Sequence, residues 1–166
     1  VTVLRNRWVQ SSGSDAVDLE HAELFRGVSG DVLSKIERLS RVQAFEQAET
    51  LFHEGDSAKD IYILRDGRVE LMYTLPQDPT TEIRITQVAP GETFAWSALA
   101  LGETLSAHAR AMVDSSAYII PAAGLHSLFR EQPRAGYLVM TRLSQQILTR
   151  LRETRKELRW LHQGAR

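Results

Sequence analysis

The sequence predicts a mainly β protein with flanking helices: an antiparallel jelly-roll β-barrel, with short helices before it and a long C-terminal helix after it. Three observations support this fold class. Apolar residues recur at helical spacing in residues 17–39 and after Pro121, and at the spacing of strands between them. Turns rich in Gly, Pro and Asp divide the middle of the chain into short runs. No proline follows Pro133, so a single helix can run from there towards the C-terminus.

The N-terminal part of the chain predicts a lead-in and two short helices. Residues 1–16 contain Ser11-Ser12-Gly13-Ser14 and show no sustained periodicity, so we expect a flexible segment. Two helices should follow up to Leu39, separated at Ser29-Gly30, where Ser29 can cap the second helix. The apolar residues of these helices are Leu24, Phe25, Val28, Val32, Leu33 and Ile36.

The middle of the chain predicts an antiparallel barrel or sandwich, and we favour a jelly roll. Asp66-Gly67 predicts a hairpin, because both residues tolerate the positive φ angles of a tight turn. Further turns are expected at Gly55-Asp56, Pro76–Pro79, Pro90-Gly91 and Asp114-Ser115. The β-prone runs contain Val42 and Phe45, Leu51-Phe52, Ile61–Leu64, Val69–Tyr73, Ile83–Ile85 and Ala117–Ile120.

The C-terminal part predicts one short helix and one long helix that pairs with a second copy. Pro121 suits the start of the short helix, and Pro133 should end it. Near the start of the long helix, Tyr137, Leu138 and Val139 widen the apolar face, so these turns should cover the barrel. We divide the chain into residues 1–16, a barrel domain 17–133 and a helix 134–166. The expected contacts of a parallel homodimer are Met140, Leu143, Ile147, Leu151, Leu158 and Leu161.

Composition narrows the class of protein. The chain is 43% hydrophobic and 25% charged, as in soluble globular domains, and it has no apolar run of the roughly 20 residues that span a bilayer. The absence of Cys excludes disulfides, thiolate catalysis and thiolate metal sites, and agrees with a cytoplasmic location. Residues 134–166 hold eight Arg or Lys and two Glu. Such a charged pattern is typical of a solvated helix face, and nucleic-acid binding is the alternative interpretation.

Several motifs in this order resemble the cyclic nucleotide-binding domain family, which includes the bacterial catabolite activator and the regulatory subunits of cyclic-AMP-dependent kinase. The resemblance covers roughly residues 22–160 and implies a jelly-roll barrel with a phosphate-binding cassette. It also implies a helix-turn-helix or catalytic domain downstream, which the sequence up to Arg166 does not provide, so nucleic acid is not an expected partner. The matching motifs are Leu51–Asp56, Ile61–Leu64, Gly67–Leu71 and Pro90–Phe94.

The cassette departs from the family pattern at two charged positions. In the family an Arg neutralises the phosphate and a Glu accepts from the ribose hydroxyl; the corresponding residues here are Leu105 and Trp96. Trp96 could stack on a planar ligand or fill the pocket. Strand alternation would place His108 and Arg110 on the same side as Ser106. The candidate ligand-binding residues are Phe94, Ala95, Trp96, Ser97, Ala98, Leu99, Leu105, Ser106, His108, Arg110 and Arg150.

Three functions compete at this point. The leading prediction is a non-enzymatic sensor in which a small anionic or planar effector, which need not be a cyclic nucleotide, enters the barrel and biases the long helix. The second is a ligand-free dimerisation module. A cupin-type metalloenzyme ranks last, because the five His residues are scattered without a His-x-His pair. We therefore predict no catalytic residue, no metal ligand and no cofactor.

Overall fold

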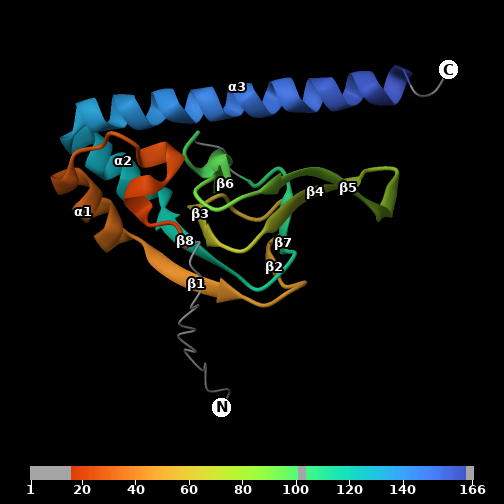
Figure 1. The fold of residues 1–166 in the computed structure, drawn as a ribbon, viewed down its shortest axis with the longest axis horizontal. Helices are drawn as coiled ribbons and strands as arrows, with labels where there is room; N and C mark the ends of the chain where they lie inside the picture. Colours follow the sequence, from red (N-terminus) through yellow and green to blue (C-terminus); the bar gives the residue numbers. More distant parts are fainter. Residues whose placement is uncertain (1–15, 101–103, 164–166) are drawn as a thin grey trace, which may run out of the picture.

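Two four-stranded antiparallel sheets form the barrel (Figure 1). The computed structural model of the protein describes residues 16–100 and 104–163. The predicted mainly β, jelly-roll fold is confirmed, with helices at one end and a long helix across the top. The first sheet has the order β1 (Arg41–Phe45), β8 (Ser115–Pro121), β3 (Asp60–Asp66) and β6 (Thr93–Phe94). The second has the order β2 (Thr50–Phe52), β7 (His108–Ala111), β4 (Val69–Leu75) and β5 (Asp78–Val88).

The N-terminal helices differ in part from the prediction. The first predicted helix consists of two single 3₁₀ turns, η1 (Leu19–His21) and η2 (Glu23–Phe25), because the backbone turns extended at Ala22 between them. The second is α1 (Gly30–Leu39), as expected. Ser29 occupies the N-cap position, but its side chain makes no capping hydrogen bond; only its carbonyl accepts from the helix. Most of the predicted lead-in lies outside the described residues.

The Asp66-Gly67 hairpin is confirmed. Gly67 has φ +88°, and its N–H donates to Asp66 Oδ1 at 2.8 Å. The next hairpin is tighter than predicted: the chain turns at Pro76-Gln77, and β5 begins at Asp78. β5 is an edge strand, so it pairs with a neighbour on one side only. A proline, which has no backbone N–H to donate, can be accommodated at such an edge. This edge position explains why Pro79 does not keep the segment out of the sheet.

The long helix α3 (Pro133–Gln163) follows α2 (Ala122–Glu131), so Pro133 starts a helix as predicted. Its first turns are part of the core: Val139 and Leu143 are buried with residues of α1 and α2. The prediction that Leu143 contacts a second copy is therefore wrong. Tyr137 is 77% exposed, so it does not widen the barrel-facing side of the helix either. Within the described residues, no helix combines the length and apolar character needed to cross a bilayer.

The hydrophobic core has two parts that place the cassette between them. One part joins the helices to β3 and includes Ala98 and Leu99. The other fills the barrel and includes Phe94 and Leu105. The cassette segment between Phe94 and Leu99 is thus held from both sides, while α3 passes over the barrel beyond it (Figure 1).

Candidate ligand-binding site

Phe94 anchors the start of the cassette. Its side chain is fully buried, and its ring lies 6.0 Å from that of Phe52 and 5.3 Å from that of Tyr62, centroid to centroid. The three rings come from β6, β2 and β3, so they tie both sheets together at this point. The chain then turns through Ala95 into the 3₁₀ turn η3 (Trp96–Ala98). This aromatic cluster sets where the cassette leaves the barrel wall.

A cavity of about 290 Å³ lies between the barrel and α3. Six of the eleven predicted residues line it: Ala95, Trp96, Ser97, Leu105, Ser106 and Arg150. Seven further lining residues were not predicted as ligand contacts: Phe52, Leu71, Ile85, Ala107, Ile147, Leu151 and Thr154. The strand residues among them, Phe52, Leu71 and Ile85, could have been found from the sequence, because alternate residues of a strand point into the barrel. Of the helix members, Ile147 and Leu151 belong to the predicted dimer seam, whereas Thr154 was not among its expected contacts.

A family model described as the cyclic nucleotide-binding domain matches residues 42–132, more than half of the chain. The chain belongs to the cyclic nucleotide-binding domain family. The resemblance predicted from the cassette motifs is confirmed.

Solved structures of similar fold include a catabolite activator protein and the sensor domain of a transcriptional regulator. The catabolite activator protein of Thermus thermophilus has a TM-score of 0.68 and 26% identity, over 84% of this chain and 63% of that one. The sensor domain of the transcriptional regulator DNR from Pseudomonas aeruginosa has a TM-score of 0.68 and 20% identity, over 81% of this chain and 89% of that one. The second likeness concerns the fold alone.

Two proteins related by sequence are much longer than this chain, and the similarity covers only a part of each. Glutaminase 1 of Bradyrhizobium diazoefficiens is 26% identical over 137 residues, which are 82% of this chain and 21% of that protein. Mouse patatin-like phospholipase domain-containing protein 7 is 28% identical over 114 residues, 64% of this chain and 8% of that protein. The chain thus spans about a fifth of the glutaminase and less than a tenth of the phospholipase.

The cyclic nucleotide-binding domain has an unusual backbone at the cassette turn. Ala95 adopts the left-handed conformation, with φ 60° and ψ 40°. A residue with a Cβ pays a steric cost of about 1 kcal/mol there. Ala98 N–H donates back to Ala95 O at 3.3 Å, and Leu99 N–H to Trp96 O at 2.9 Å. Phe94, Ala98 and Leu99 do not line the cavity; their buried side chains support this turn.

Trp96 lines the cavity of the domain and leaves it open. Its Nε1–H donates to Thr93 O at 2.7 Å, which fixes the plane of the indole. The Arg150 Cζ atom lies 5.0 Å from the indole centroid, a cation–π distance. The indole therefore connects the cassette to α3 while about 290 Å³ remains free beside it. Of the two roles considered for Trp96, the geometry favours lining over filling.

Leu105, at the position that the resemblance assigns to the family arginine, forms an apolar wall of the cavity. It is only 6% exposed and packs in the barrel core, where its backbone N–H donates to Asp56 O and its carbonyl accepts from Gly55 N–H, each at 2.8 Å. The one cation among the lining residues is Arg150, which comes from α3 and whose side chain is 16% exposed. Positive charge thus reaches the cavity from the helix.

His108 and Arg110 face the other side of β7, so their expected orientation is wrong. Ala109 between them packs in the barrel core, and neither neighbour lines the cavity. Arg110 donates to both carboxylate oxygens of Glu82, at 3.0 and 2.9 Å, and His108 Nε2 lies 3.4 Å from Glu82 Oε1. The hydrogen bonds from Arg110 hold the pKa of Glu82 below its usual value. Ser106 and Ala107 form a bend, so the strand alternation begins only at His108.

Part of the predicted dimer seam is exposed on α3. Met140, Ile147 and Leu151 are exposed, and they are joined by Leu148 and Tyr137, which the seam prediction did not include. Ile147 and Leu151 also line the cavity, so one helix segment borders both the cavity and the solvent. Leu158 and Leu161 lie on α3 by their backbone, but their side chains fall outside the described part of the chain.

Proposed function

We propose that this cyclic nucleotide-binding domain is a non-enzymatic sensor that binds a small planar anion in the barrel cavity and thereby biases α3. The observation that carries the proposal is that cassette and helix share one cavity, with Trp96 and Arg150 in contact across it. The family membership and the fold likeness to transcriptional regulators support a regulatory role. Its location in this proposal is the cytoplasm, consistent with the absence of Cys.

The chemistry of the cavity suggests the ligand class. Its walls are largely apolar or aromatic, with Trp96 as the stacking surface, whereas Ser106, Arg150 and Thr154 provide the polar edge. A planar ring with one anionic group would satisfy both. Leu105 offers no charge to a cyclic phosphate, and an unpaired buried anion is costly. We therefore expect cyclic AMP to bind more weakly than a planar carboxylate.

The signal would pass through the helix. A ligand shifts an equilibrium only if it binds the two states with different affinities. A molecule held between the cassette and Ile147, Arg150 and Leu151 makes part of its contacts to α3, so it binds more tightly to the arrangement in which the helix lies over the barrel. The position of α3 is the quantity that the ligand would control.

Isothermal titration calorimetry with cyclic AMP, cyclic GMP and a series of aromatic carboxylates tests the sensor. We expect saturable binding of at least one aromatic carboxylate, weakened at least about tenfold in Arg150→Gln, because a charge-assisted hydrogen bond is worth about 1.5–3 kcal/mol. Arg152→Gln changes an exposed arginine two positions further along α3 and should leave the affinity unchanged. Equal affinities of the wild type and Arg150→Gln would contradict the proposed site.

A ligand-free dimerisation module is the second candidate. Two features favour it: the Arg150 guanidinium already lies over a face of Trp96, and the apolar Leu105 stands at the position that the family resemblance assigns to the phosphate-binding arginine. A complete lack of heat with every compound in the series would favour this candidate over the sensor.

In either case we propose a parallel homodimer through the exposed stripe of α3. Leu148→Glu places a charge on a half-exposed position of the stripe that does not line the barrel cavity, so we expect the dissociation constant to rise at least tenfold. Light scattering across a concentration series measures it. Lys156→Glu, at an exposed position further round the same helix from the stripe, is the matched control and should leave the dimer intact. A wild-type protein that is monomeric at all concentrations contradicts the dimer.

A further inference from the structure

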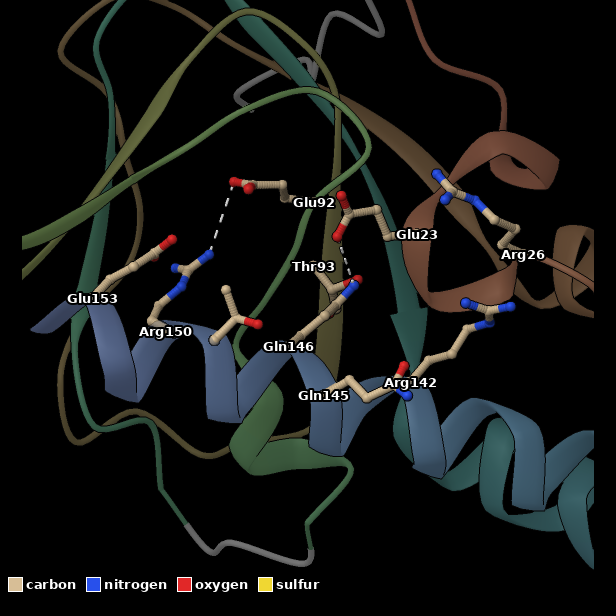
Figure 2. Close-up of a pocket in the computed structure, with 10 residues that line it drawn as sticks. Glu23, Arg26, Glu92, Thr93, Arg142, Gln145, Gln146, Arg150 and Glu153 are labelled. Atoms are coloured by element: carbon tan, nitrogen blue, oxygen red, sulfur yellow. Dashed lines mark hydrogen bonds and ion pairs between the residues drawn. The ribbon is translucent and has the colours of Figure 1, made fainter.

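A second cavity, of about 270 Å³, lies between α3, η2 and the start of β6. Arg150 is the one residue that lines both this cavity and the barrel cavity. Figure 2 shows α3 along one side, with Glu92 and Thr93 above it and Glu23 and Arg26 at the end formed by η2. In contrast to the apolar barrel cavity, every residue of this lining is polar or charged. They are Glu23, Arg26, Glu92, Thr93, Arg142, Gln145, Gln146, Thr149, Arg150 and Glu153.

Four of these residues carry a polar atom that is covered from solvent and has no hydrogen-bond partner among the described residues. The atoms are Thr93 Oγ1, Arg142 Nε, Gln146 Oε1 and Arg150 Nη1. Thr93 is only 1% exposed. Native structures seldom leave such groups unpaired, so their concentration around one cavity points to a missing partner. The two guanidinium N–H groups and the hydroxyl can donate, whereas the Gln146 oxygen can only accept.

Two of the three acidic residues of the lining are engaged, whereas Arg26 and Arg142 form no ion pair with any described residue. Glu23 Oε2 accepts from Gln146 Nε2 at 3.2 Å. Glu92 Oε2 accepts from Ala89 N–H at 2.8 Å and lies 3.8 Å from Arg150 Nη2 (Figure 2). Arg142 forms no ion pair with any residue that the structure describes. Of these two arginines, Arg142 has the covered, unpartnered N–H group, whereas Arg26 is exposed to solvent, so a bound anion would find its strongest partner in Arg142.

We propose that this cavity is a second ligand site, which binds a small carboxylic acid that bears an amino or hydroxyl group beside the carboxylate. The carboxylate accepts from Arg142 and Thr93, and the neighbouring N–H or O–H group donates to Gln146 Oε1. The lining contains three Arg and three Glu, so it has no net charge. This favours an α-amino acid, which is a zwitterion without net charge, over an α-hydroxy acid, which is an anion. The cavity has room for such a molecule together with several waters, since a water molecule occupies about 30 Å³ in the liquid.

Such a ligand would join α3 to the rest of the domain. Arg142, Gln146 and Arg150 project from α3, while Thr93 belongs to β6. The acid would thus connect the helix to the start of the cassette through polar contacts, whereas the barrel cavity connects them through mainly apolar ones. Because Arg142 does not line the barrel cavity, the site can be tested whether or not the proposed sensor ligand exists.

Side-chain ¹H–¹⁵N NMR of the whole chain tests the site with L-alanine, L-lactate and acetate at equal ionic strength. The Arg142 Nε–H signal is assigned by its loss in Arg142→Gln. We expect alanine and lactate to shift it saturably, alanine at the lower concentration, and acetate to bind at least tenfold more weakly, because acetate has no donor for Gln146 Oε1. The Nε–H signal of Arg152, an exposed residue of the same helix, should not move.

Gln146→Met provides a variant that keeps Arg142 and removes the acceptor. In this variant alanine should no longer bind more tightly than acetate. An Arg142 signal that no acid moves, or that acetate moves as strongly as alanine in the wild type, overturns the proposal. The wild-type titration alone decides between these results, so an unfolded variant does not prevent the test. If lactate binds more tightly than alanine, the result supports the site and shows that the group donating to Gln146 Oε1 is a hydroxyl.

Discussion

Gly67→Ala should lower the free energy of unfolding by at least about 3 kcal/mol, because the turn leaves no room for a side chain. Gly67 has φ +88°, a conformation that costs a residue with a Cβ about 1 kcal/mol. A Cβ atom would also lie 2.7 Å from the backbone oxygen of Asp114 and 2.7 Å from Ser115 Cα. Neither atom can rotate away, so the β3–β4 hairpin would have to separate from the start of β8.

Urea unfolding followed by circular dichroism measures this loss, and Gly55→Ala is its matched control. Gly55 has nearly the same backbone, with φ +87°, but an added Cβ would have no neighbour within 4 Å. It should therefore lose only the conformational part, about 1 kcal/mol. Equal losses in the two variants would show that the close approach to Asp114 has no energetic effect.

Phe94→Ala is expected to cost about 3–5 kcal/mol, as is usual for a large aromatic side chain removed from a core. The ring is fully buried, and it contacts the rings of Phe52 and Tyr62 from the two other strands of the cluster. Its loss leaves a void between the sheets directly before the left-handed residue Ala95. Because domains of this size are stable by only about 5–15 kcal/mol, the variant should be strongly destabilised.

The same urea experiment checks Phe94→Ala against Val113→Ala. Val113 is an apolar residue that is 46% exposed, so its truncation should change the free energy of unfolding by no more than about 0.5 kcal/mol. A loss below about 1.5 kcal/mol for Phe94→Ala would contradict the view that the aromatic cluster holds the cassette in place.

The candidate site was only partly predictable from the sequence. Trp96, Ser106 and Arg150 were identified because the family motifs place the cassette and its covering helix along the chain. His108 and Arg110 were assigned to the wrong face, since the alternation was counted from Ser106, whose segment is a bend. Counting by twos holds only within a strand. The polar cavity at Arg142 left no pattern in the sequence, because its residues come from three separated segments.

The dimer seam shows the same limit. A stripe of residues spaced by three and four predicts one face of a helix, and α3 has that face. Spacing does not tell which neighbour the face meets. Leu143 packs into the core of its own chain, whereas Leu151, two turns later, is 44% exposed. The helix leaves the helical end of the domain between these residues and passes over the barrel (Figure 1).

By itself, the sequence determined the order of the elements, the Asp66-Gly67 hairpin, the helix start at Pro133 and the family of the domain. These features depend on residues close together in the chain, whose φ angles and periodicity act locally. Only the tertiary structure decided that Trp96 lines its cavity, that the cation comes from Arg150 and that Arg142 borders a second cavity. These depend on where α3 lies over the cassette, which is set by packing between segments about 50 residues apart.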